Sequence, residues 1–378
     1  TSSVRLLCLR VAHRPTSTNV TLMITAPEIK AQALELGFDL CGIAPVVSLP
    51  ELGFLREWVD HGYAGEMSYM TRSADRRADV RAVLPSARSV VMLATVYHVD
   101  RPYSIETGKP TEASIARYAW GDDYHQVIGA RTDALCRWMA ERAGAAFQGK
   151  TYVDTGPVQE RVYAQHAGLG WIGKNTCLIN AEQGSWLFLS EVICSLDLPP
   201  DEVALDQCGN CTLCIEACPT EALPRPWVLD ATKCLSYLTI ELKNGVPESQ
   251  RDDLTNHVFR CDICQDVCPW NSAPAKSDDG AWAPRAIFDR PSLTDLWTRS
   301  DAELRVAIKG SALKRAGVKR LRRNLAVALG NSGDAKARDA LDQTLSGAET
   351  DEIPSVRDPV VAEHVDWAQR KLALASQG

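Results

Sequence analysis

The spacing of apolar and polar residues along the first half of the chain predicts alternating helices and strands. Apolar residues recur every three to four positions at 26–36, 52–60, 127–142 and 158–166, which is typical of helices that bury one face. Short apolar or β-branched runs predict strands at 38–44, 89–99 and 151–153, and the runs 176–180 and 185–196 predict a hairpin. The polar segment 67–77 predicts a loop. The pattern therefore favours a mixed fold of the α+β class.

The last hundred residues predict only helices. From residue 281 the pattern is helical, and the paired short segments that begin at 335 and 360 resemble the end of an α-solenoid of the HEAT type. Just before them, the stretch 310–323 carries six basic residues and no acidic one: Lys314, Arg315, Lys319, Arg320, Arg322 and Arg323. This run is either a solvated helix face or a contact for nucleic-acid phosphates, and its isolation in an otherwise acidic chain favours the phosphates.

Composition sets limits on these readings. The chain has 378 residues, 45% of them hydrophobic, so it can build a substantial core in two or three domains. Its formal charge is −7, so any affinity for nucleic acid must come from a local patch. No apolar run approaches the ~20 residues of a membrane span. We expect residues 1–22 to be disordered, or an extension upstream of the true start at Met23.

The cysteines carry the strongest chemical signal. The run from Cys208 to Pro219 has the spacing C-x2-C-x2-C-x3-C-P, in which the fourth cysteine of a ferredoxin run serves a different cluster from the first three. A second set, completed by Cys234, ends in another Cys-Pro pair. We therefore predict two 4Fe–4S clusters with crossed ligands: Cys208, Cys211, Cys214 and Cys268 for the first, and Cys218, Cys234, Cys261 and Cys264 for the second.

Zinc and disulfides are the alternatives for these cysteines. A structural zinc site typically uses two separated pairs of ligands, not a four-cysteine run that ends in proline. Disulfides are rare in a chain of this size outside oxidising compartments. The remaining thiols are scattered through the sequence, which indicates a reducing cytoplasm.

One turn in the first half is a candidate for catalysis. A predicted strand delivers Asp154 to a turn set by Gly156 and Pro157, and reactive groups are often placed where strands end. A turn-capping aspartate is an equally good reading of the residues alone. Arg76 and Arg77 form a second candidate, as a contact for a cofactor phosphate or carboxamide, although a solvated arginine pair is the more common case.

Several motifs occur together and in one order: 117–125 (RYAWGDDYH), 153–155 (VDT), 167–175 (AGLGWIGKN), the crossed cysteine set, 234–239 (CLSYLT) and 310–312 (GSA). In this combination the chain resembles the epoxyqueuosine reductases, which complete the synthesis of queuosine in tRNA. The resemblance covers residues 23 to about 375.

The resemblance implies three domains after the first 22 residues. Residues 23–199 would form a cobalamin-binding α/β domain like the nitroreductase-related cobalamin-trafficking proteins. Residues 200–280 would form a ferredoxin-type module, and 281–378 a HEAT-like helical domain that binds tRNA. The implied enzyme is a cytoplasmic, monomeric oxidoreductase that reduces epoxyqueuosine at the wobble position. Its cofactors would be the two clusters and a cobalamin that rests as cob(II)alamin, and its electrons would come from an external low-potential donor.

The resemblance also assigns roles to residues. It makes Asp154 the catalytic acid, and burial against the corrin would raise its pKa so that it holds a proton. Lys174 and Asn175 would meet cofactor or substrate, and Ala116 replaces a cysteine that faces the corrin in some relatives. The implied cobalamin contacts are Arg77, Asp154, Leu178, Leu189, Ser236, Cys261 and Asp262, and Lys243 joins the basic run as a tRNA contact.

Two other functions fit part of the chain. A reductive dehalogenase uses the same cofactor set, but such enzymes lack the basic helical tail. A plain electron carrier would leave the residues before and after the cysteines without a role. The tail and the upstream motifs therefore favour the tRNA enzyme.

Overall fold

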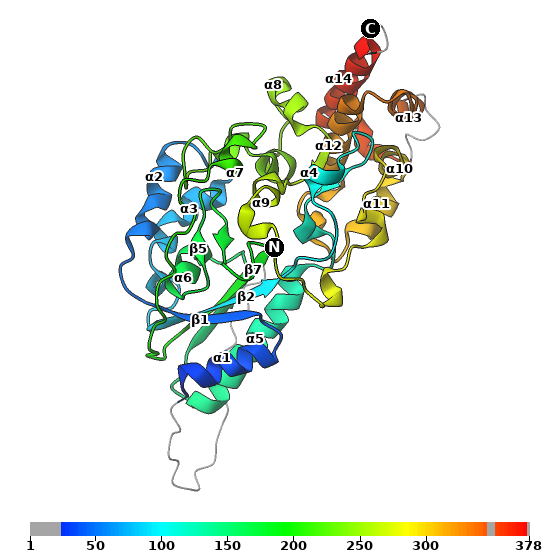
Figure 1. The fold of residues 1–378 in the computed structure, drawn as a ribbon. Coiled ribbons are helices and arrows are strands. Elements are labelled where there is room, and N and C mark those ends of the chain that lie inside the picture. Colours follow the sequence, from blue (N-terminus) through cyan, green and yellow to red (C-terminus); the bar gives the residue numbers. More distant parts are fainter. Residues whose placement is uncertain (1–23, 346–351, 376–378) are drawn as a thin grey trace, which may run out of the picture.

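The computed structural model describes residues 24–345 and 352–375, so the predictions for residues 1–22 lie outside the described part. The centre of the first half is a four-stranded antiparallel sheet (Figure 1). Its strands lie in the order β1 (Leu40–Pro45), β2 (Ser89–Val96), β7 (Leu187–Cys194) and β4 (Gly149–Tyr152). Every residue of β2 is buried, as its apolar, β-branched sequence predicts.

Helices cover both faces of this sheet, which gives three layers. On one face, α1 (Ala26–Glu35) packs against β1 and α5 (Tyr124–Ala143) packs against β7, whose even-numbered residues Phe188 and Val192 belong to the core on this side. On the other face, α6 (Glu160–His166) packs against Met92 and Ile193. Successive strand side chains point to opposite faces, so Leu189 and Glu191 lie on the α6 side. The mixed α/β architecture is confirmed.

Two predicted elements are wrong. The segment 67–77 is not a loop, because α3 (Ser68–Arg77) occupies it, after α2 (Phe54–Asp60). The predicted hairpin does not form: β6 (Leu178–Ile179) pairs with β5 (Trp171–Ile172), while β7 joins the central sheet. Only an isolated bridge between Asn180 and Gly184 closes the turn. The position of β7 follows from its long apolar run, which is buried better between two strands of the central sheet, β2 and β4, than at the edge of a short ribbon.

The cysteine region consists of short elements. Its helices are α7 (Leu213–Glu216), α8 (Glu248–Arg251), α9 (Ile263–Asp266) and a π-helical turn over Tyr237–Glu241. The short strand β8 (His257–Phe259) pairs in parallel with β3 (Ser114–Ile115), which follows α4 (Ser104–Thr107), and so ties this region to the first half.

The tail is helical, as predicted. It contains α10 (Leu293–Thr298), α11 (Asp301–Ile308), α12 (Gly317–Ser332), α13 (Ala335–Leu345) and α14 (Pro359–Ala375), with α12 in contact with the other four. No helix in the described ranges is both long and apolar enough to cross a membrane.

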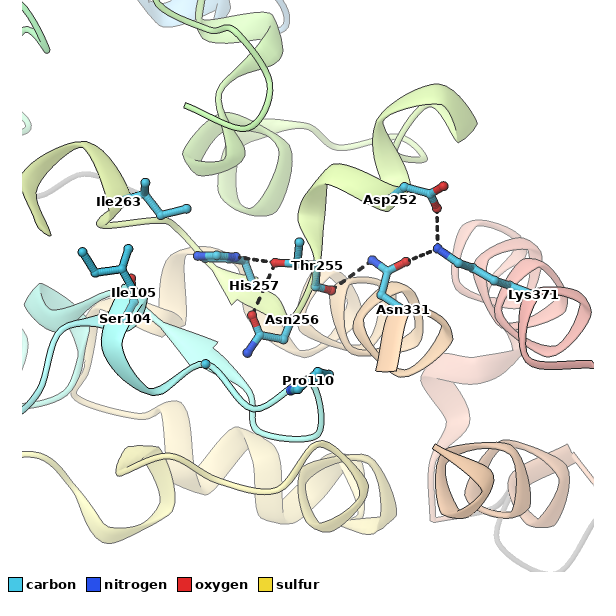
Figure 2. Close-up of a pocket in the computed structure, with 11 residues that line it drawn as sticks. Ser104, Ile105, Pro110, Asp252, Thr255, Asn256, His257, Ile263, Asn331 and Lys371 are labelled. Carbon is cyan, nitrogen blue, oxygen red and sulfur yellow. Dashed lines mark hydrogen bonds and ion pairs between the residues drawn. The ribbon is translucent and has the colours of Figure 1, made fainter. Parts of the chain in front are cut away.

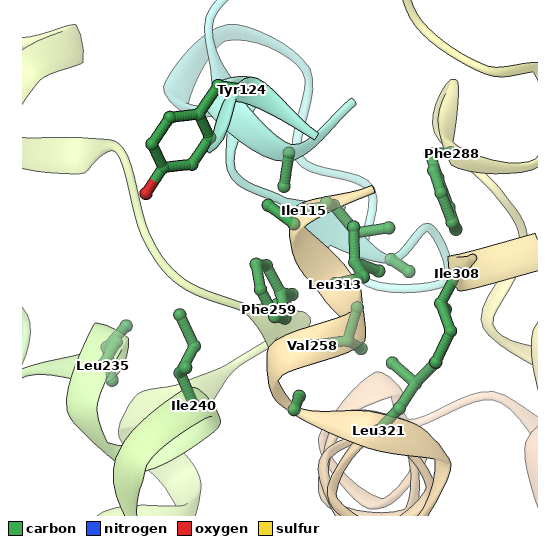
Figure 3. Packing of buried hydrophobic residues seen from close by; sticks show 14 of the residues in the cluster. Ile115, Tyr124, Leu235, Ile240, Val258, Phe259, Phe288, Ile308, Leu313 and Leu321 are labelled. Atoms are coloured by element: carbon green, nitrogen blue, oxygen red, sulfur yellow. The ribbon is translucent and has the colours of Figure 1, made fainter. Parts of the chain in front are cut away.

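One apolar core joins all three parts of the chain. Figure 3 shows Ile115 and Tyr124 from the first half, Phe259 from the cysteine region and Leu313 and Leu321 from the tail packed around one another. Separate cores would let these parts move as independent bodies, whereas a shared core fixes their relative positions. Groups from all three parts can therefore form one site.

Candidate active site and cluster-binding thiols

Asp154 lies in the turn after β4 with a backbone φ of 58°, a left-handed conformation that is uncommon for a residue with a side chain. Its Oδ2 accepts a hydrogen bond of 3.0 Å from the Tyr124 hydroxyl and lies 3.4 Å from His125 Nε2, in an ion pair. On the opposite side of the imidazole, His125 Nδ1 lies 2.8 Å from Asp123 Oδ1. The first turn of α5 thus places an imidazole between two carboxylates.

This arrangement fixes where the proton resides. Burial alone would lower the pKa of His125, but its interactions with Asp123 and Asp154 raise the pKa to about 9. Desolvation by the surrounding protein would raise the pKa of Asp154, but His125 and the Tyr124 hydroxyl hold it well below its ordinary value. At neutral pH the pair is therefore an imidazolium and a carboxylate.

Within the protein two neighbouring donors stabilise the Asp154 anion, so the proton that burial against a corrin would add stays a prediction. The Asp154 side chain is nevertheless 54% exposed, so a substrate can reach it. The proton that Asp154 would deliver is held on His125, in direct contact with it.

The eight predicted cluster cysteines form two neighbourhoods. Burial raises the pKa of Cys214 and of Cys268 to about 11, and for both thiols the charge of Cys208 adds to the shift. Burial likewise raises the pKa of Cys261, and the charges of Cys234 and Cys218 add to this shift. A hydrogen bond with Cys177 contributes most to the raised pKa of Cys264, and burial and the charges of Cys261 and Cys234 add to it, while Cys211 adds to the raised pKa of Cys214. The assignment of these thiols to two crossed sets stays a prediction, and Cys177 lies among them although it belongs to neither set.

The spacing of the eight cysteines in the sequence is typical of cluster ligands. Within the described ranges, no three His, Cys, Asp or Glu side chains come close enough together to hold one metal ion. Cubane ligands each bind a different iron, so their sulfur atoms stand farther apart than the ligands of one ion. The described cysteines are all free thiols, as cluster ligands must be before assembly.

The glycine-rich turn before β6 holds both cysteine loops. The buried Lys174 donates to the carbonyls of Gly209 (2.6 Å) and Cys211 (2.9 Å) in the first loop. Asn175 donates to the carbonyl of Cys264 (3.0 Å) in the second. Both side chains are thus engaged with protein backbone, and the expectation that they meet cofactor or substrate gives way to a role in fixing the loops.

Some of the predicted cobalamin contacts lie beside the second set of thiols. The hydroxyl of Ser236 interacts with the Cys234 thiol, and the buried Asp262 accepts a hydrogen bond of 2.6 Å from the Arg117 amide. Arg77, at the end of α3, donates to the Val158 carbonyl (2.7 Å). Leu178 is buried, and Leu189 is half-buried on β7. The half-buried guanidinium and hydroxyl suit the carboxamides around a corrin ring, and the leucines suit its apolar face.

Two of the predicted tRNA contacts are wrong. Arg322 and Arg323 are only 0% and 1% exposed. Arg322 forms an ion pair with Asp301 and donates to two carbonyls of the tail, while Arg323 donates to three carbonyls of the segment 238–244. Both side chains therefore join α12 to its neighbours and cannot meet phosphates.

The other basic residues lie at the surface. Lys314, Arg315, Lys319 and Lys243 are exposed, and Arg320 is half-buried. The positive charge of Arg315 helps to lower the pKa of Asp154, and that of Lys314 helps to lower the pKa of Asp123. Arg315 is itself held by Glu241, with which it forms an ion pair of 2.6 Å. The start of the basic run thus borders the carboxylates of the candidate active site.

A separate cavity of about 440 Å³ lies between α4, β8, α12 and α14 (Figure 2). Lys371 bridges Asp252 and Asn331 along it, and burial lowers the pKa of His257, at its floor, to about 4. None of the predicted site residues lines this cavity. Its position identifies it as a feature distinct from the Asp154 site.

Sequence reasoning missed several residues of the site. Tyr124 and His125 stand in a motif that was recognised, but their contact with Asp154 depends on the fold. Arg260, which precedes Cys261, has a φ of 60° and stacks on Tyr118 at 4.5 Å, and no sequence pattern marks it. Glu160 and Glu191 also lie close to Asp154, and a charged residue in the apolar β7 was the one signal available for Glu191.

Two sets of four thiols beside an exposed carboxylate and its protonated partner define an iron–sulfur oxidoreductase with its own acid–base pair. Residues 207–271 match the family described as a 4Fe-4S double cluster binding domain, and residues 77–155 match the family described as Epoxyqueuosine reductase QueG, DUF1730.

Relatives of the whole chain give the particular family. The epoxyqueuosine reductase of Gloeobacter violaceus is 43% identical over 323 residues, which cover 83% of this chain and 98% of the relative. That of Pseudomonas aeruginosa is 38% identical over 350 residues, which cover 92% of this chain and 94% of the relative. A crystal structure of epoxyqueuosine reductase with an epoxyqueuosine-modified tRNA-Tyr stem loop is similar to this structure, with a TM-score of 0.80 and 28% sequence identity. The match covers 92% of this chain and 89% of the crystallised one. The chain belongs to the epoxyqueuosine reductase family.

Proposed function

We propose that this protein reduces epoxyqueuosine to queuosine in tRNA, with electrons relayed through two 4Fe–4S clusters to a cobalamin. Family membership supports the reaction, since the match extends over almost the full length of relatives that are named epoxyqueuosine reductase. The single observation that carries the chemistry is the ion pair of Asp154 and His125, because the reaction must protonate an oxygen. A reductive dehalogenase is not favoured by these relatives.

The balance of the reaction defines what the protein must supply. Converting an epoxide to an alkene consumes two electrons and two protons and releases water, so both protons go to the same oxygen. The cobalamin, when bound, would supply the two-electron reduction of the carbon–oxygen bonds. The eight cysteines would hold the clusters, and Arg77, Leu178, Leu189, Ser236, Cys261 and Asp262 would hold the corrin.

The residues of the chain then handle the protons. Asp154, which is exposed, would take the proton from His125 and pass it to the oxygen as negative charge develops there. Tyr124 orients the carboxylate, and Asp123 orients the imidazole so that Nε2 faces Asp154. After the first delivery His125 must recover a proton before the second.

We propose that the tRNA contacts are Lys243, Lys314, Arg315, Lys319 and Arg320, without the two buried arginines. A related enzyme has been crystallised with a modified tRNA stem loop, which supports a tRNA substrate here. Phosphates bound along these side chains would lie next to the carboxylates through Lys314 and Arg315. The nitroreductase-like and HEAT-like descriptions, the domain bounds 23–199, 200–280 and 281–378, the low-potential donor, the cytoplasmic location and the monomeric state remain predictions of the same proposal.

Anaerobic reconstitution tests the function. The protein is loaded with iron, sulfide and cobalamin and incubated with reductant and tRNA that carries epoxyqueuosine, and the nucleosides are then analysed by mass. We expect the nucleoside to lose one oxygen atom with the unmodified protein and to remain unchanged with Asp154→Asn. If the epoxide persists with fully loaded, unmodified protein, the proposal is wrong.

A further inference from the structure

Glu191 occupies an unusual position for a carboxyl group. It lies in the middle of β7, between β2 and β4, on the face covered by α6, and it is 0% exposed. Among the described residues no amine, amide or hydroxyl group donates a hydrogen bond to either of its oxygens. An ionised carboxylate without donors in such a place is costly, so the group must retain a proton.

Glu160 connects this buried group to the candidate active site. It is the first residue of α6, and its Oε1 accepts a hydrogen bond of 2.6 Å from the backbone N–H of Asp154. That bond holds the turn in which Asp154 adopts its left-handed conformation. The side chains of Glu160 and Glu191 also interact with each other, which is favourable only when a proton lies between them.

The charges around the pair agree with a retained proton. Burial, and then the negative charge of Asp154, raise the pKa of Glu160 to about 8. Burial and the charge of Glu160 raise the pKa of Glu191 well above its ordinary value. Arg77 from α3 and Arg161 from α6 oppose these shifts but do not cancel them, and the hydroxyls of Tyr152 and Tyr163 also face Glu191.

We propose that Glu160 and Glu191 form a proton-sharing carboxyl pair that positions Asp154 for catalysis and sets the alkaline limit of the reaction. The inference rests on the proposed function. While the pair keeps its protons, Glu160 anchors the Asp154 turn and adds no negative charge beside it. When Glu160 ionises, a second carboxylate stands next to Asp154, and the turn is pushed away from its catalytic position. Both glutamates are positioning residues, since neither contacts the reacting oxygen.

Two amide variants and one control test the pair. Glu160→Gln keeps an acceptor for the Asp154 N–H but cannot ionise, so the alkaline fall of the single-turnover rate should move up from about pH 8 towards pH 9, where His125 loses its proton. Glu191→Gln gives Glu160 a permanent donor and allows it to ionise earlier, so the fall should move below pH 8. Glu182→Gln, at the exposed turn before β7, should leave the profile unchanged.

A second measurement does not depend on turnover. Infrared spectra of cluster-loaded, cobalamin-free protein should show a carbonyl band of protonated carboxylic acids that declines between pH 7 and 9 in the unmodified protein and in Glu182→Gln. This decline should be absent in Glu160→Gln. Glu160→Ala, which removes the anchor, should reduce the rate at every pH by up to about 100-fold, the scale expected for a misplaced catalytic group.

The outcomes separate this inference from the proposed function. The pair has no such role if the unmodified protein converts epoxyqueuosine but the rate of both amide variants falls at the same pH as that of the unmodified protein. The same conclusion follows if the infrared band does not titrate. If the unmodified protein does not convert the nucleoside at all, the function itself is wrong, and the infrared result alone then decides whether the two carboxyls share a proton.

Discussion

Replacing Arg322 with methionine should destabilise the protein without weakening its contact with tRNA. The guanidinium lies at the centre of the tail, where it pairs with the buried Asp301 and donates to the carbonyls of Trp297 and Arg299. Breaking a buried ion pair by removing one partner costs about 3–5 kcal/mol, and each carbonyl left without a donor adds about 1–3 kcal/mol.

The lower end of this range applies for two reasons. Asp301 keeps two hydrogen bonds from Ser355, at 2.9 Å from the amide and 2.8 Å from the hydroxyl. Methionine also fills much of the space that the arginine chain occupied. We therefore expect Arg322→Met to lower the free energy of unfolding by about 5 kcal/mol.

Denaturant unfolding, followed by tryptophan fluorescence, measures this loss, and a salt series of tRNA titrations measures the contact. The matched control is Lys319→Met on the same helix, whose side chain is 50% exposed and paired with Asp358 at 2.6 Å. It should change stability by less than about 1 kcal/mol and reduce the salt slope of tRNA binding by about one. If Arg322→Met reduced the salt slope while unfolding stayed unchanged, the placement of Arg322 in the interior would be wrong.

Three further predictions concern the candidate site. Asp154→Asn should abolish turnover while iron content and cobalamin binding stay normal; loss of either cofactor would make Asp154 structural. The pKa of His125 is raised from 6.5 to about 9, so its ion pairs should stabilise the protein fully below about pH 6.5 and lose this effect as pH rises through 9; His125→Gln should remove that dependence from thermal unfolding curves. Lys174→Met should speed the loss of iron from one cluster to a chelator, and equal rates would contradict its role in holding the first cysteine loop.

Local patterns in the sequence predicted local features well. The cysteine spacing predicted two 4Fe–4S clusters because a tight loop allows few arrangements of its thiols, and the match of residues 207–271 to a double cluster binding domain agrees with it. The run 89–99 was recognised as a buried strand because its residues are apolar throughout. The turn at Asp154 was recognised from Gly156 and Pro157.

Features that depend on contacts distant in sequence could not be predicted. The basic run looked uniformly exposed, but α12 packs against four other helices and buries Arg322 and Arg323 where backbone carbonyls accept their donors. The ion pair that holds Asp154 ionised within the protein was missed because its partner His125 lies on another element. The pairing of β7 with β2 and β4 was missed because the short turn before β7 favoured a hairpin.

The most direct test of the account is the number of electrons consumed for each nucleoside converted. Fully loaded protein is mixed anaerobically with excess epoxyqueuosine-containing tRNA, and a reductant is added in small measured portions while queuosine is quantified by mass. The account predicts two electrons for each queuosine formed, with no product when the cysteines of either set are replaced by serine. Product formation without the cysteine sets, or without consumption of reductant, would contradict it.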